Sequence, residues 1–493
     1  MGSSSAKAEF SLEQGRRLRA GGHLYAALEQ LNDGVKAQAT LSGPSLGTLY
    51  DELGVLHVAQ GATDRALAYF IRAVETSEGR EQALRFSMHL ALMYRRQCEL
   101  DKALRLLSRL ISEAGSGTPT TTLALLYGNL GLVQGYNNYH REALQSSLTC
   151  LSCLQNNEDH HYLPDVLTNI GHHLLQLHRF DEAQEYLLRA QSLAGFDYLP
   201  AKSELCRLYY RAGRFEDATA IALTLLDGVW SSGFSLEKEE IAQVCELLAF
   251  LARDAGRLDL AVRLLEKAQL LFGQIRLWRE WQRTQVLLDT WHAELASPCV
   301  AAHADAFVSE RMEEFVTLLD ALHAQEVIHP KFGQLLDVRV QYARSLAELS
   351  GLPQQDQAQL VLACRLADFG LTALEPDVIA SPRRSEAAWR HYAGHPELSL
   401  RLLDRTQLPH GVRVLIRDHH LPYDANSPTA PTGPIETATG VDTRSLFSIA
   451  DAYADAVVLR EVRHSDALAS VCKEAGKAYD PRLAAALSSL FDV

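Results

Sequence analysis

The chain has 493 residues, a formal net charge of −14 at pH 7, 47% hydrophobic residues and 22% charged residues. This length gives room for about two to four domains, each with its own core. The acidic balance excludes a general nucleic-acid binder, because such proteins need a basic face for the phosphates. No apolar run reaches the length of a membrane span.

The first residues, Met1 to Ser5, are polar and do not predict a signal peptide. The 8 cysteines are scattered along the chain, which favours reduced thiols and a cytoplasmic location. Cys150 and Cys153 form a CxxC without a second pair or a flanking histidine set. We interpret them as small residues on a helix.

Residues 10–275 repeat a pattern in which a turn and a charged residue precede an alanine and an apolar helix. The aligned alanines lie 35 to 43 residues apart. A small residue at this position lets the second helix of a pair cross the first closely, and a glycine in the turn adopts a left-handed conformation without cost. The aligned alanines are Ala27, Ala66, Ala103, Ala143, Ala183, Ala218 and Ala261.

This pattern resembles tetratricopeptide repeats, whose minimal period is 34 residues. The resemblance implies about seven helix pairs in a right-handed superhelix, with a concave face that holds a partner protein or peptide. The candidate groove residues are polar positions on the first helices. They are Arg95, Asn129, Asn169, His172 and Arg207.

After the repeats, residues 276–305 predict a linker helix with Trp278, Trp281 and Trp291. We expect it to cap the last repeat, because terminal repeats must cover an apolar face. A dimer contact through the tryptophans is the alternative. A second helix, near residues 304–325, leads into a C-terminal domain over residues 306–493.

Within that domain, acidic and imidazole side chains occur on successive apolar segments. They are Asp368, His395, the vicinal pair His419 and His420, and Asp451. Carboxylates and imidazoles from separate helices meet in bundle cores and hold transition metals. The pattern therefore predicts a helical metal site, with packing of these residues in an apolar core as the alternative.

From about Phe315 to Leu490 the chain resembles HD-GYP phosphodiesterases, which hydrolyse cyclic di-GMP with two or three metals. The matching motifs are Arg339-Val340, His395-Pro396, His419-His420, Ala450-Asp451 and Asp480-Pro481. Three family positions differ: Leu336 and Ala367 replace histidines, and Leu371 replaces a lysine. Asp424 fits the start of the family's Gly-Tyr-Pro signature, but residues 425–428 have lost the rest.

The resemblance implies that one family metal site keeps only Asp368 and Asp451. The second keeps Asp368, His395, His419 and His420. We therefore predict at most one divalent metal (iron, manganese or zinc), and a pseudoenzyme rather than an active hydrolase, because a two-metal clamp has lost half its ligands.

The sequence as a whole predicts an all-α chain, a tetratricopeptide superhelix followed by an HD-domain-like bundle. The predicted function is that of a bacterial cytoplasmic signalling protein whose repeats bind a partner and whose degenerate HD-GYP domain binds or dimerises. The alternatives are a metal-dependent phosphodiesterase acting on cyclic di-GMP or a related nucleotide, and an adaptor with an inert second domain. A cyclic dinucleotide ligand and a homodimer stay open, and neither a nucleic acid nor a membrane is expected.

Overall fold

The computed structural model is helical throughout the part of the chain it describes and contains no strand there. The prediction of an all-α chain is thus confirmed. Among these residues, no helix has the length and apolar content needed to cross a membrane. The described residues are 2–38, 44–60, 62–115, 117–154, 161–195, 198–231, 238–275, 277–295, 306–380, 385–404, 406–421, 423 and 442–491.

The contacts divide the chain into two compact units. The repeat unit comprises residues 38–230 and 236–313, and the terminal unit comprises residues 1–37, 231–235 and 314–493. The boundaries 10–275, 276–305 and 306–493 stay a prediction from sequence.

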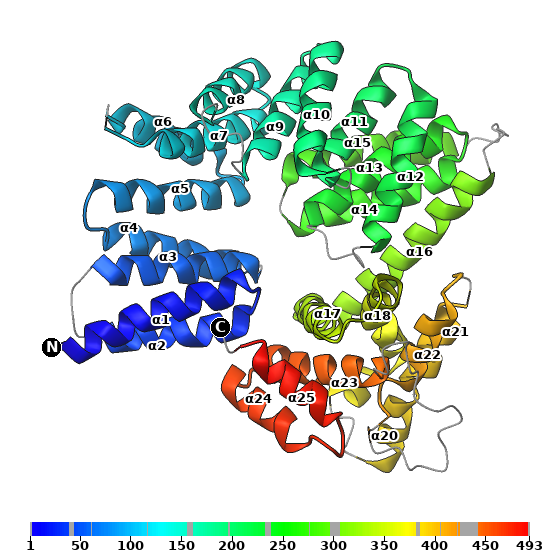
Figure 1. Cartoon of the computed structure of the whole chain (residues 1–493). Helices are drawn as coiled ribbons and strands as arrows, with labels where there is room; N and C mark the ends of the chain where they lie inside the picture. Colours follow the sequence, from blue (N-terminus) through cyan, green and yellow to red (C-terminus); the bar gives the residue numbers. More distant parts are fainter. Residues whose placement is uncertain are drawn as a thin grey trace. The chain divides into compact units, whose positions relative to one another are not determined.

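The repeat unit is built from helix pairs that follow one another in chain order (Figure 1). The odd-numbered helix of each pair is called here the first helix. The helices are α3 (Pro44–Ala59), α4 (Thr63–Glu75), α5 (Arg80–Arg96), α6 (Leu100–Glu113), α7 (Thr120–Tyr136), α8 (His140–Leu154), α9 (Leu163–Gln176), α10 (Phe180–Ala194), α11 (Leu199–Arg211), α12 (Phe215–Ser231), α13 (Lys238–Asp254), α14 (Leu258–Gln274) and α15 (Trp278–Leu295).

The aligned alanines lie where the two helices of a pair cross. From Ala66 to Ala261, each sits on the second helix of its pair and is fully buried. Across the crossing, a Cβ added to Gly131 of α7 would lie 3.2 Å from the Ala143 carbonyl oxygen. Small residues on both sides therefore allow the close approach that the repeat pattern predicted.

The turn between the helices of a pair uses one residue with positive φ. Gly213 and Gly256 have φ values of 74° and 77°, as expected for glycine. Cys98, Asn138 and His178 take the same conformation at 59°, 61° and 60°. Among non-glycine residues, asparagine and histidine are enriched in this region, whereas the turn at Cys98 carries strain that a glycine would avoid.

The terminal unit combines the C-terminal helices with the first two helices of the chain. Helix α16 (Ala306–Ile328) enters this unit at Glu314. Its other elements are α1 (Gly2–Ala20), α2 (Leu24–Gln38), α17 (Phe332–Leu349), α18 (Gln354–Leu366), the 3₁₀ segment η1 (Ala367–Ala373), α19 (Pro376–Ala380), α20 (Glu386–Ala393), α21 (His395–Leu402), α22 (His410–Asp418), α23 (Thr443–Ala454), the π-helical segment η2 (Asp455–Leu459), α24 (His464–Lys473) and α25 (Pro481–Ser489).

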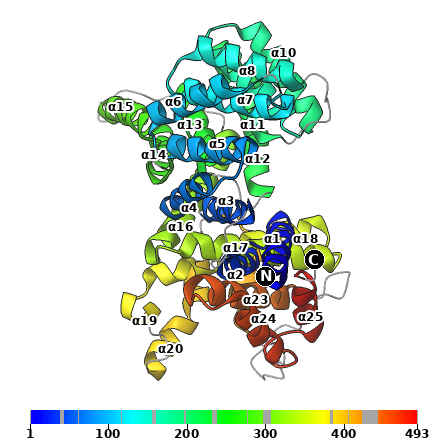
Figure 2. The same cartoon turned by 90° about the vertical axis from the view of Figure 1, so that its left-hand side faces the viewer.

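The turn between α1 and α2 meets α17 and the C-terminal end of the chain (Figure 2). Gln341 donates a hydrogen bond to the Gly22 carbonyl oxygen, and the ring of buried His23 lies 4.8 Å from that of Phe491. Arg463 pairs with Glu29 of α2 at 2.6 Å. Although Ala27 carries the repeat pattern, its hairpin packs with helices more than 300 residues away in sequence.

Candidate functional site

A groove of about 510 Å³ opens in the repeat unit. Most of its lining comes from successive first helices, α7, α9, α11 and α13, and from the start of α15. This is the face on which stacked helical repeats form a concave binding surface.

The structure brings three of the five predicted groove residues together. Asn169, His172 and Arg207 line the groove. Arg95 is not among the lining residues. Its guanidinium lies 5.0 Å from the ring centre of Tyr136, and Tyr136 does line the groove. Asn129 is buried and donates to the Leu125 carbonyl oxygen of its own helix at 2.8 Å, so its amide serves α7 rather than the groove.

Charged residues that the sequence analysis did not single out make up much of the groove. On α13 and α15, Glu239, Glu246 and Glu280 line it together with Arg283, which pairs with Glu246 at 2.5 Å. Burial raises the pKa of Glu280, and the nearby carboxylates add to this effect. Only the repeat register, which places the first helices side by side, would have revealed this cluster.

On α11 the charges are mostly basic. Arg207 forms an ion pair with buried Glu204, one turn earlier. Burial opposes ionisation of Glu204, but Arg207 and then His172 lower its pKa to about 2. Burial lowers the pKa of Arg211, and the charge of Arg207 lowers it further. The groove thus has a basic stretch on α11 and an acidic one on α13 and α15.

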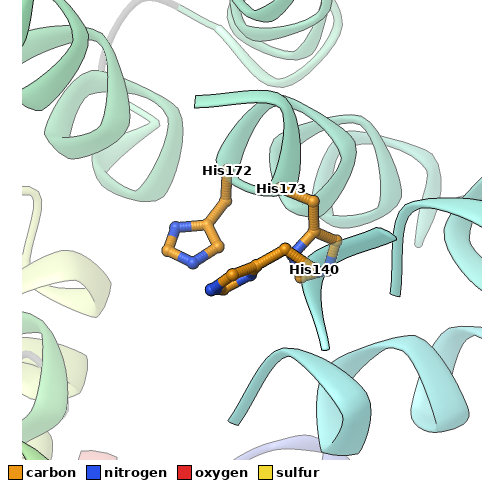
Figure 3. A group of neighbouring side chains, drawn as sticks. All are labelled: His140, His172 and His173. Carbon is orange, nitrogen blue, oxygen red and sulfur yellow. The ribbon is translucent and has the colours of Figure 1, made fainter. Parts of the chain in front are cut away.

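Three of the residues that line this groove are histidines whose side chains are neighbours (Figure 3). His140 begins α8, and His172 and His173 are neighbours on α9. One ring nitrogen from each lies within 4.8 Å of the others.

The second candidate site lies in the terminal unit and contains all five predicted metal ligands in one region. His395, His419 and His420 each place a ring nitrogen within 4.8 Å of the other two. The His395 Nε2 lies 3.2 Å from Asp368 Oδ1. Asp451 lies outside the group formed by these three imidazoles, and it pairs with an arginine instead.

That arginine is Arg339 of α17, which the sequence analysis treated only as a motif match. One guanidinium nitrogen lies 2.7 Å from Asp368 Oδ2 and 2.5 Å from Asp451 Oδ1. The side chain is 3% exposed, and it also donates to the Cys364 carbonyl oxygen at 3.1 Å. Burial lowers the pKa of Arg339, but the two carboxylates outweigh it and raise that pKa.

The imidazoles are held so that their Nε2 atoms face the site. His395 Nδ1 lies 2.7 Å from the Tyr392 carbonyl oxygen, and His419 Nδ1 lies 2.7 Å from that of Ile416. A carbonyl accepts only from N–H, so each Nδ1 carries a proton and each Nε2 is turned toward the site. The His419 Nε2 is buried without a hydrogen-bond partner, whereas the His395 Nε2 faces Asp368 Oδ1 at 3.2 Å.

Electrostatics keep these groups in their metal-binding forms. Burial opposes ionisation of Asp368, but Arg339 and then His395 hold its pKa well below the usual value. Burial lowers the pKa of His419 well below its usual value and also lowers that of His420. An ionised Asp368 carboxylate and the neutral imidazoles of His419 and His420 fit one transition-metal ion.

A tight contact between η1 and α21 positions Asp368 beside His395. Ser399 donates to the Ala367 carbonyl oxygen at 2.6 Å and accepts from the Gly370 amide at 2.7 Å. Leu336, Ala367 and Leu371, at the positions where the resemblance expects two histidines and a lysine, are buried apolar residues. Asp424 and residues 425–428, at the position of the family's Gly-Tyr-Pro signature, lie outside the described residues.

Comparisons with known proteins concern the helical repeats. The family model described as "Tetratricopeptide repeat" matches residues 164–197, so this part of the repeat prediction is confirmed. None of the curated proteins compared with the chain matches it significantly.

Solved structures that are similar to this chain include a tetratricopeptide repeat protein from Parabacteroides merdae ATCC 43184. It matches at 17% identity and a TM-score of 0.41, and the match covers 57% of this chain and 99% of that one. The apo form of RapI matches at 14% identity and a TM-score of 0.45, covering 55% and 98%. A Rap protein complexed with Competence and Sporulation Factor matches at 16% identity and a TM-score of 0.42, covering 59% and 87%.

Proposed function

We propose that the repeat unit binds a partner protein and takes a peptide segment of it into the groove between the first helices. The observation that carries this proposal is the groove itself, about 510 Å³ in volume and lined by polar and charged side chains. Stacked helical repeats use this face for binding. The free cysteines of the described residues favour a cytoplasmic location for such a regulator.

The charges in the groove favour a segment that carries both a basic and an acidic side chain. Glu280 has a raised pKa beside Glu239 and Glu246, so a lysine or arginine of the partner would relieve the repulsion between these groups. Arg211 has a lowered pKa beside Arg207, so an acidic side chain would be favoured there. This complementarity would fix the direction of the bound segment.

We expect Glu280→Lys to weaken binding of such a segment by about 10- to 100-fold, because a basic side chain of the peptide would meet a like charge. The peptide is first selected on the wild-type chain from a random-peptide library, and its affinity is measured by fluorescence anisotropy. The matched control is Glu185→Lys, the same change on the exposed surface of α10, outside the groove. Equal affinity for both variants, or no selected peptide, would contradict the proposal.

For the terminal unit we propose a degenerate HD-GYP-like module that binds a cyclic dinucleotide or a second copy of the chain without hydrolysis. Support comes from Arg339, whose guanidinium lies between Asp368 and Asp451, the two carboxylates left at one family metal position. A fixed side-chain cation at that position competes with a metal ion. Two-metal hydrolysis needs an ion there to clamp one of the reacting oxygens.

A second candidate function, a one-metal phosphodiesterase, is favoured by the cluster of His395, His419 and His420 and by the unpaired Nε2 of His419. A metal held by these imidazoles and Asp368 would supply an activated water or polarise a phosphate. The chain's own contribution is to hold the Asp368 carboxylate ionised and the His419 imidazole neutral.

The two candidates differ in an activity assay on cyclic di-GMP and its linear dinucleotide. We expect the purified chain to leave both substrates intact with added Mn²⁺ or Fe²⁺. We also expect it to retain about one equivalent of metal that is lost in the His420→Ala variant. Metal content is measured by plasma mass spectrometry. Turnover that His420→Ala abolishes would instead establish the phosphodiesterase.

A further inference from the structure

The three histidines at the edge of the groove have the composition of a metal site rather than of an ordinary polar cluster. His140, His172 and His173 present three imidazole nitrogens within 4.8 Å of one another. A Zn²⁺ ion with Zn–N bonds of about 2.1 Å holds its nitrogens about 3.4 Å apart. Binding of the ion would therefore require rotation about the Cα–Cβ and Cβ–Cγ bonds to bring the nitrogens closer together.

His173 is the anchor of this cluster. Its side chain is buried, 3% exposed, and neither of its ring nitrogens has a hydrogen-bond partner. Leaving such a group buried and unpaired is unfavourable. Both ring nitrogens face the interior unpaired, so one of them is available to a ligand.

The backbone nearby is shaped around this ring. A Cβ on Gly135 of α7 would lie 2.6 Å from His173 Cε1, so the absence of a side chain at Gly135 makes room for the imidazole. His140 Nδ1 is also buried without a hydrogen-bond partner. Two of the three imidazoles therefore have an unused nitrogen inside the protein.

The third imidazole is directed by a carboxylate. His172 Nδ1 lies 3.1 Å from Oε2 of Glu204, which is 7% exposed. A carboxylate behind one ring nitrogen orients a histidine and makes its other nitrogen a better metal ligand. The negative charge of Glu204 also offsets part of the positive charge of Arg207 and Arg211.

We propose that His140, His172 and His173 form a transition-metal site for Zn²⁺, with Glu204 as the carboxylate that orients His172. Imidazole ligands suit zinc, and three of them leave the fourth position of a tetrahedral ion free. The site borders the groove, so a water or a side chain of a bound segment completes the ion's coordination. The site does not depend on the partner, and it is distinct from the terminal-unit histidines.

The test is zinc binding to the full chain after removal of metal with a chelator. Isothermal titration is carried out on the wild type and on the His140→Ala/His172→Ala variant, which leaves buried His173 in place. We expect the variant to bind about one equivalent less Zn²⁺ than the wild type. With Co²⁺, the wild type should show the strong visible absorption of a four-coordinate ion, reduced in the variant.

The matched control is His292→Gln, a half-exposed histidine of the same unit outside the cluster, which should keep the wild-type stoichiometry. If the metal-free double variant keeps the wild-type circular dichroism and melting temperature, its loss of zinc binding does not result from misfolding. If the double variant misfolds, the single variant His172→Gln is used in its place. Equal zinc stoichiometry in the wild type and the folded variant would overturn the proposal, as would an anion binding there in place of zinc.

Discussion

Replacing Arg339 with leucine is expected to lower the free energy of unfolding of the terminal unit by about 3–5 kcal/mol. The guanidinium contacts Asp368 and Asp451 from a position that is 3% exposed. Without it, Asp368, whose own side chain is 7% exposed, would keep its charge only beside His395 or would take up a proton. Leucine fills much of the same volume, so most of the loss reflects the unpaired charge.

The measurement is hydrogen exchange of peptides from α17 and α23 over a urea series, which reports opening of this unit alone. Arg365→Leu is the matched control. Arg365 is also buried, at 7% exposure against 3% for Arg339, but its partner Asp337 lies 2.7 Å away and is 67% exposed. Its removal leaves a solvated carboxylate and should cost far less. Similar losses in both variants would mean that packing, not charge, explains the effect.

A second variant isolates the electrostatic contribution. Adding Asp368→Asn and Asp451→Asn to Arg339→Leu removes the charges that the guanidinium neutralises. We expect this triple variant to be more stable than Arg339→Leu alone, because replacing a whole buried ion network by neutral groups costs less than breaking it. A further loss of stability would show that the carboxylates hold the unit together by other contacts.

The repeat architecture was predictable because its signal is local. A small residue at a fixed place in each pair is enough to identify the crossing, and the six alanines from Ala66 to Ala261 are buried there as expected. The hairpin of α1 and α2 carries the same local pattern at Ala27. What it packs against depends on contacts such as Gln341 with Gly22, which no periodicity encodes.

The candidate sites divide in the same way. The adjacent histidines His419 and His420 indicate a metal site in the sequence, and His172 and His173 are adjacent in the same way. The latter was not recognised as part of a metal cluster, because His140 lies on the preceding helix pair and joins them only in the fold. The role of Arg339 was hidden for a related reason, since its partners Asp368 and Asp451 come from two other elements.

Gly370→Ala is expected to displace α21 from η1 and to destabilise the terminal unit by about 3 kcal/mol or more, at the upper end of overpacking effects. An added Cβ would lie 2.1 Å from the His395 carbonyl oxygen and 2.6 Å from the Ser399 amide nitrogen. Both are backbone atoms, so no side-chain rotation can relieve the clash. The hydrogen bond from the Gly370 amide to the Ser399 hydroxyl would also lengthen.

This displacement should reach the imidazole cluster, because His395 begins the helix that must move. We expect Gly370→Ala to lose both protection of the α21 amides in hydrogen exchange and the metal that His420→Ala removes. Gly394→Ala is the matched control one residue before His395: its Cβ would lie 3.4 Å from the Arg390 and His391 carbonyl oxygens, an ordinary contact. Gly370→Ala and Gly394→Ala could instead retain the same metal content and the same protection of the α21 amides. The close approach of η1 and α21 would then not be what positions His395 beside Asp368.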